Sequence, residues 1–168
     1  MADGNDPGLG SRLVIGAIAG FVGTMAMTAA MRGLHRKLPA KERYPLTPRE
    51  IVDVVFDPPA AAAPDLALAA HFAYGAGCGA LIAAANPHIG PVSGALAGGA
   101  VWLTSYMGWI PAFGVLKPAT AHPLRRNAVM VAAHFAWGWS TAEAIRELTA
   151  ARDTIFADGT DKDVPKRA

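Results

Sequence analysis

One stretch of this chain, residues 66–116, decides its fold: LALAAHFAYGAGCGALIAAANPHIGPVSGALAGGAVWLTSYMGWIPAFGVL. These 51 residues contain no Asp, Glu, Lys or Arg. A helix of about 20 residues crosses the hydrocarbon layer of a bilayer, so the stretch is long enough for two crossings. The segment Asn86-Pro87-His88-Ile89-Gly90-Pro91 interrupts it with prolines and a glycine, which end one helix and begin the next. We therefore predict two membrane-spanning helices joined by this turn.

Apolar segments elsewhere in the chain extend this pattern. Together they predict four spans, at about residues 13–31, 66–85, 92–110 and 128–145. Backbone amides in lipid must be hydrogen-bonded within their own segment, so each span must be a helix. We therefore expect an all-α integral membrane protein with one four-helix transmembrane domain over residues 13–148.

The segments outside this domain are polar. Residues 1–12 are expected to form an N-terminal tail and residues 149–168 a C-terminal tail, disordered from Ala157 onward. Within the first loop, Thr47-Pro48-Arg49-Glu50 has the spacing of a capping box with proline at the first helical position. We expect a short amphipathic helix to begin there.

Charge and composition limit the class of protein. Of 168 residues, 52% are hydrophobic and 17% are charged, and the net charge of +2 is too small to indicate a nucleic-acid partner. The first and third loops carry nine Lys and Arg residues, against six on the other side. By the positive-inside rule the two longer loops are cytoplasmic and both termini face outward, so a bacterial inner membrane is expected. Cys78 is the only cysteine, which excludes an intrachain disulfide and a c-type haem.

Small residues recur at helical spacing inside the spans, which allows helix backbones to approach closely in lipid. The glycines predicted to pack helices are Gly16, Gly20, Gly75, Gly79, Gly94, Gly98 and Gly138. The same pattern suggests a homo-oligomer or a larger membrane complex. The lipid bilayer itself is the other expected partner.

An internal repeat relates the two halves of the chain. Residues 69–75, AAHFAYG, return as residues 132–138, AAHFAWG, and residues 16–20, GAIAG, return as residues 94–98, GALAG. These matches predict two duplicated helical hairpins, related by an axis along the membrane normal. His71 and His134 should therefore lie at similar depth, about 8 to 10 Å inside the cytoplasmic boundary.

The repeat and its flanks also carry a family resemblance. The helix GALAG, the Pro/Gly-rich stretch through Pro111, Gly114 and Pro118, and residues 134–140, HFAWGWS, followed by IREL at residues 145–148, resemble the YagU-like family of small bacterial inner-membrane proteins. The segment LTPR at residues 46–49 fits this family as well. The resemblance implies an integral inner-membrane protein. It implies no reaction, substrate or cofactor.

Three ionisable residues within the spans form the candidate intramembrane polar site: His71, His134 and Glu143. Ionisable groups in a bilayer are costly and often functional. The histidines could bond across the helix interface, take part in proton movement, or bind a transition metal or a b-type haem. Glu143 is expected to pair with Arg146 at i, i+3. The aromatic residues of the spans are expected to serve as interfacial or packing residues.

Three functions remain open from these residues. The first is a structural or accessory membrane protein for envelope or proton homeostasis, in which the histidines brace the bundle. The second is a proton or small-solute transporter that uses the same histidines, and the third is a haem-binding protein. The chain shows no nucleophile with a base, no phosphate-binding loop and no metal motif, so we expect no enzyme, no metal site and no cofactor other than this haem.

Overall fold

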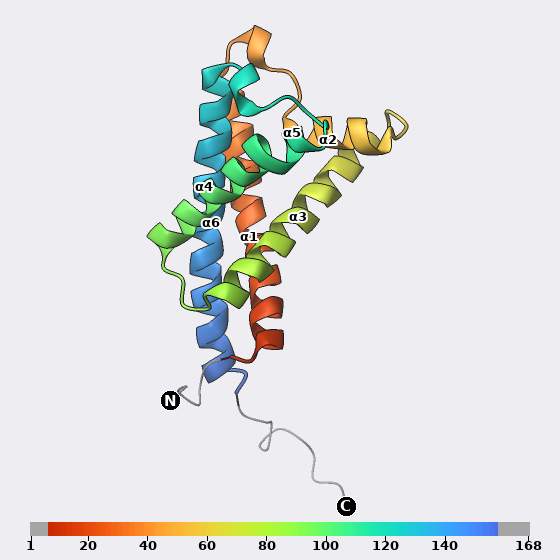
Figure 1. Ribbon diagram of the computed structural model, residues 1–168. Coiled ribbons are helices and arrows are strands. Elements are labelled where there is room, and N and C mark those ends of the chain that lie inside the picture. Colours follow the sequence, from red (N-terminus) through yellow and green to blue (C-terminus); the bar gives the residue numbers. More distant parts are fainter. Residues whose placement is uncertain (1–6, 158–168) are drawn as a thin grey trace, which may run out of the picture.

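The computed structural model describes residues 7–157, and every regular element in them is helical. The terminal segments 1–6 and 158–168 lie outside the described residues, and so does most of the tail expected from Ala157 onward. The main elements in Figure 1 are α1 (Leu9–His35), α2 (Thr47–Phe56), α3 (Ala63–Ala85), α4 (Pro91–Thr104), η2 (Ser105–Trp109, a π-helix), α5 (Ile110–Ala112) and α6 (Leu124–Thr154). Two short 3-10 turns, η1 (Ala40–Glu42) and η3 (Ala119–Ala121), lie in the connections.

Two of the helices described here, α1 and α3, are long and apolar enough to cross a membrane. They contain the predicted spans 13–31 and 66–85. The predicted span 92–110 begins as α4, which has 14 residues, and continues through η2. The predicted span 128–145 lies within α6, whose polar side chains lower its hydropathy. This helix continues to Thr154, into the segment predicted to be a polar tail.

Helix α1 lies at the centre of the arrangement. It packs against α3 on one side and against α6 on the other, and α6 in turn packs against α4. Figure 1 shows that α1 begins and α6 ends at one end of the molecule, whereas α2 and α5 lie at the opposite end. Ile89, in the turn between α3 and α4, belongs to the same core cluster as Ile15 and Ile145. This turn is therefore near the end where α1 begins.

The predicted glycines lie at two close helix crossings. At the α1–α3 crossing, a methyl group added to Gly79 would lie 2.6 Å from the Cα atom of Gly20 and would also meet the carbonyl of Gly16. At the α4–α6 crossing, a methyl group on Gly138 would lie 2.9 Å from the amide nitrogen of Gly98 and would meet the carbonyl of Gly94. Backbone therefore meets backbone at both crossings, which only glycine allows.

The contacts also give the register of the two crossings. Gly79 contacts Gly16 and Gly20 as Gly138 contacts Gly94 and Gly98. The sequence repeat, however, aligns Gly138 with Gly75, which lies one helical turn before Gly79. The two helix pairs thus pack in the same way. The glycine of α3 that lies at the crossing, however, is one helical turn after the glycine that the sequence repeat aligns with Gly138.

On α1, most of the large apolar side chains face outward and most of the small residues face inward. On α1, six outward-facing residues are between 37% and 61% exposed: Leu13, Val14, Ile18, Phe21, Val22 and Met25. The buried positions of this helix include Gly16, Ala19, Gly20, Gly23 and Thr24. A helix of a water-soluble protein places its large apolar residues in the core. The exposed face of α1 is therefore compatible with apolar surroundings.

The short helix of the first loop is present, but its predicted capping box is wrong. Helix α2 begins at Thr47 with Leu46 at the N-cap, and no side-chain hydrogen bond caps it. The Glu50 carboxylate reaches Arg126 of α6 instead, at 3.2 Å. A buried arginine offers the carboxylate a charged partner, and this attraction is stronger than the hydrogen bond to a backbone amide.

Candidate functional site

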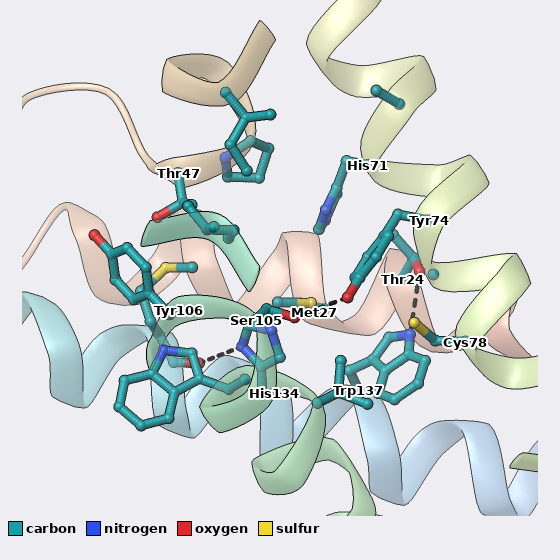
Figure 2. A pocket seen from close by; sticks show the side chains of 18 of the residues that line it. Thr24, Met27, Thr47, His71, Tyr74, Cys78, Ser105, Tyr106, His134 and Trp137 are labelled. Carbon is teal, nitrogen blue, oxygen red and sulfur yellow. Dashed lines mark hydrogen bonds between the residues drawn. The ribbon is translucent and has the colours of Figure 1, made fainter. Parts of the chain in front are cut away.

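A pocket of about 220 Å³ lies among α1, α2, α3, α4, η2 and α6. Figure 2 shows that His71 from α3 and His134 from α6 both point into it. The repeat therefore brings its two histidines to one cavity, and they are close enough for electrostatic interaction. The walls are mostly apolar and include Met27, Ile51, Val52, Phe56, Val101, Ile110 and Met130.

The hydrogen bonds of the two histidines do not join helices. The Nδ1 atom of His134 lies 2.8 Å from the carbonyl oxygen of Met130, one turn earlier in the same helix. Because a carbonyl can only accept, Nδ1 carries the hydrogen, and Nε2 of the neutral ring keeps a free lone pair. The Nε2 atom of His71 is buried without a hydrogen-bond partner. The two rings therefore have hydrogen-bonding capacity that the described contacts leave unused.

Four buried polar atoms without partners line this single pocket. They are His71 Nε2, Thr47 Oγ1, Trp102 Nε1 and Tyr106 Oη. The side chains of Thr47 and Tyr106 are 7% and 3% exposed, so bulk water does not reach them freely. Figure 2 shows the two hydroxyls on the same side of the pocket. An unpaired buried polar group costs about 1–3 kcal/mol, so this cluster indicates a site that a ligand completes.

The π-helix η2 brings three aromatic or polar side chains to the pocket. Pro111 has no amide hydrogen, so the regular hydrogen bond to Met107 cannot form, and the helix widens over Ser105–Trp109. Gly108, with φ −108° and ψ −105°, takes up the resulting kink. Ser105, Tyr106 and Trp109 then face the cavity. Such π-helical segments often occur at functional sites.

Three aromatic side chains of the pocket lining, from α2, α3 and η2, reach the surface of the molecule. The Tyr74 hydroxyl lies 2.8 Å from Ser105 Oγ, and the Tyr74 ring contacts that of Trp109 with centroids 6.3 Å apart. Tyr74, Trp109 and Phe56 are 45%, 37% and 61% exposed, although all three also line the cavity. These aromatic side chains therefore link the pocket lining to the outer surface.

Arg126 holds α2 and its loop beside the pocket. The guanidinium is 1% exposed and donates to the carbonyl oxygens of Tyr44, at 2.9 Å, and of Pro45, as well as to Glu50. It also lies over the Tyr44 ring, 3.6 Å from the centroid. The Tyr44 hydroxyl meets His122 Nδ1 at 3.1 Å, and the His122 ring stacks on Tyr106. These contacts fix the position of Thr47 and Tyr106 together.

Glu143, the third predicted site residue, lies apart from the pocket. Its carboxylate pairs with Arg146 at 3.1 Å, which confirms the predicted i, i+3 pair, and both side chains reach the surface. Within residues 7–157, no three His, Cys, Asp or Glu side chains gather as a metal site would need. Only the two histidines of the predicted polar site come together.

The sequence predicted Tyr106 and Trp102 as interfacial or packing residues and Thr47 as a helix cap. Their common location depends on the widened helix and on the long-range contacts of Arg126, neither of which has a local pattern. Pro111 near the end of an apolar span was the available signal, since proline disturbs the hydrogen bonds of the turn before it.

Comparisons of the chain with protein families, with curated proteins and with solved structures find no match. The resemblance to the YagU-like family therefore stays a prediction that rests on its motifs.

Proposed function

We propose that this chain is a multi-pass inner-membrane protein of the YagU-like type that holds a small lipid-soluble molecule in the pocket between His71 and Tyr106. Four spans, arranged as two duplicated hairpins, enclose the site, and the longer loops lie in the cytoplasm. The observation that carries the proposal is the group of four unpartnered polar atoms in one mostly apolar cavity. Sites for small molecules have this composition.

Three features support the membrane location. Helices α1 and α3 have the required length and apolarity, and large apolar side chains cover the outside of the molecule. Helices α4, η2 and α5 form a nearly continuous helical segment from Pro91 to Ala112, and α6 contains 31 residues. The two remaining predicted spans are therefore long enough when kinked or tilted.

The hydrogen bonds favour ligand binding over bundle bracing by the histidines. Bracing requires a bond from each ring to another helix, whereas His134 bonds to its own helix and His71 Nε2 has no partner. The connection between helices comes instead from Trp137, whose Nε1 donates to Thr24 Oγ1 at 3.2 Å and Gly20 O at 3.3 Å. The histidines are therefore available to an occupant of the pocket.

The predicted homo-oligomer was based on the glycines that pack helices. All seven contact other helices of the same chain, so they do not provide a second surface for another copy. Self-association would need a different surface and stays a prediction. A mass measurement in mild detergent and cross-linking in native membranes test it.

Binding can be tested with 2-bromonaphthalene, a small apolar molecule whose bromine quenches tryptophan emission on contact. Ala70 lines the pocket, whereas Ala73, on the same helix, is exposed and does not line it. We expect Ala70→Leu in lipid nanodiscs to remove the saturable part of the quenching, and Ala73→Leu to leave it unchanged. Equal quenching of the wild type and both variants would show that the pocket holds no such molecule.

The topology has a separate test with cysteine labelling in whole cells. Cys78 is replaced by alanine, and a single cysteine is introduced at Lys41 in the first loop or at Ala85 near the second turn. We expect a membrane-impermeant maleimide, added outside the inner membrane, to label Ala85→Cys and not Lys41→Cys. The reverse pattern would overturn the proposed orientation.

A further inference from the structure

The unpartnered atoms of the pocket define what the occupant must offer. Trp102 Nε1 can only donate a hydrogen bond, and the hydroxyls of Tyr106 and Thr47 can each donate one. Thr47 and Tyr106 lie on one side of the cavity, and His71, whose Nε2 is also unpartnered, lies on another side. The occupant should therefore carry more than one hydrogen-bond acceptor.

The charges around the pocket exclude several classes of occupant. No Asp, Glu, Lys or Arg side chain lines it, so neither an anion nor a cation would find a counter-charge there. A hydrocarbon would leave all four polar atoms unpaired. Water alone is a poor filling, because most of the walls are apolar and offer it no hydrogen bonds. A neutral molecule with acceptor oxygens remains.

The shape of the pocket favours a flat ring. Six aromatic side chains line it: Phe56, Tyr74, Trp102, Tyr106, Trp109 and Trp137. A cavity of about 150 Å³ holds benzene, so one of about 220 Å³ has room for a molecule of up to two fused rings. Phe56, Tyr74 and Trp109 line the cavity and also reach the outer surface, where an alkyl tail would leave the pocket.

We propose that the pocket binds a small lipid-soluble quinone, whose ring lies among the aromatic side chains. One carbonyl oxygen accepts hydrogen bonds from Trp102 and Tyr106, and the opposite carbonyl oxygen accepts one from His71 Nε2. Figure 2 shows Tyr106 and His71 on different sides of this cavity, as two opposed carbonyl oxygens require. The lone pair of His134 Nε2 adds an acceptor for the hydroxyl of a reduced ring. This assignment rests on the proposed function of the pocket.

The test compares menadione with 2-methylnaphthalene, which has the same rings and methyl group but no carbonyl oxygens. Partitioning of each probe is measured between nanodiscs that contain the protein and empty nanodiscs of the same lipid. We expect the protein to bind menadione at least about tenfold more tightly, because each hydrogen bond contributes about a five- to tenfold gain.

Single substitutions assign this gain to particular donors. Tyr106→Phe and Trp102→Phe should each weaken menadione binding about five- to tenfold and leave 2-methylnaphthalene unaffected. Trp139→Phe, at an exposed position outside the pocket, is the control and should change neither. Circular dichroism and the unchanged binding of 2-methylnaphthalene show that each variant is folded.

Two other outcomes overturn different proposals. If both probes bind equally and Tyr106→Phe affects neither, the pocket accepts apolar molecules and the quinone assignment is wrong. In the Ala70→Leu variant the larger side chain fills the pocket. If neither probe binds the wild type better than it binds this variant, the proposed function is wrong as well.

Discussion

Replacing Gly79 by alanine should separate α1 from α3 and destabilise the protein. The added methyl group would lie 2.6 Å from Gly20 Cα and 2.8 Å from Gly20 N. Carbon atoms make favourable contact at about 3.5 Å or more, so the helices must move apart by about 1 Å. No rotation of a side chain can relieve this contact, since backbone lies on both sides.

Gly77→Ala on the same helix is a matched control. A methyl group at Gly77 meets nothing within 4 Å. Alanine is a better helix former than glycine by about 0.8–1 kcal/mol, and this gain is the same at both positions. The difference in stability between the two variants therefore equals the steric cost at the crossing. Overpacking of this kind costs about 1–3 kcal/mol, and we expect the upper part of this range because the contact involves backbone.

The assay is reversible unfolding in mixed micelles, followed by circular dichroism as the fraction of sodium dodecyl sulfate rises. Gly79→Ala should unfold at a lower fraction of this detergent than the wild type, and Gly77→Ala at an equal or higher one. Gly138→Ala should match Gly79→Ala, because both residues meet the backbone of a glycine pair. Equal unfolding midpoints for Gly79→Ala and Gly77→Ala would refute the close crossing.

Three further predictions concern the loop, α2 and the pocket. Arg126→Met leaves Glu50 and two backbone carbonyls unpaired, so thermal unfolding should show a loss of about 3 kcal/mol, whereas Glu50→Gln, which can still accept from Arg126, should cost less. Asp57 ends α2 with φ 41°, so Asp57→Gly should raise the stability measured by the same unfolding assay by about 1 kcal/mol. Protein purified from cells supplied with haem should have a featureless visible spectrum. The pocket of about 220 Å³ is smaller than the sites of larger ligands, which measure about 300–1,000 Å³. A Soret band that is lost in His71→Ala would contradict this prediction.

The local sequence is sufficient to locate the helices that carry the fold. Residues 66–116 predict the break at Asn86–Gly90, and the structure ends α3 at Ala85 and begins α4 at Pro91. Prolines and glycine act on their own neighbours, so their effect is visible in the sequence. The register of the helix crossings cannot be predicted in this way, because it depends on which glycine of one helix contacts which glycine of another helix. The repeat suggested Gly75 as the counterpart of Gly138, but the residue of α3 that makes the equivalent contacts is Gly79.

The site could be predicted only in part. His71 and His134 stand out because charged or titratable groups are rare in apolar spans, and both line the pocket. Thr47 lies in a distant loop and reaches the cavity only because Arg126 holds that loop through contacts with residues some 80 positions away. Tyr106 faces inward only because η2 widens. Contacts of this range have no periodic pattern in the sequence.

The central place of α1 affects how the protein is made. Helix α1 leaves the ribosome early and packs against α3, but its other face stays without a partner until α6, the last helix within residues 7–157, is synthesised. Trp137, His134 and Arg126 all belong to α6, so the pocket wall and the contact that holds α2 both form at the final step. A partly made chain therefore leaves the Gly23 face of α1, which packs against Trp137 and Thr141, uncovered until α6 is made. A chain truncated before α6 has no complete pocket to fill.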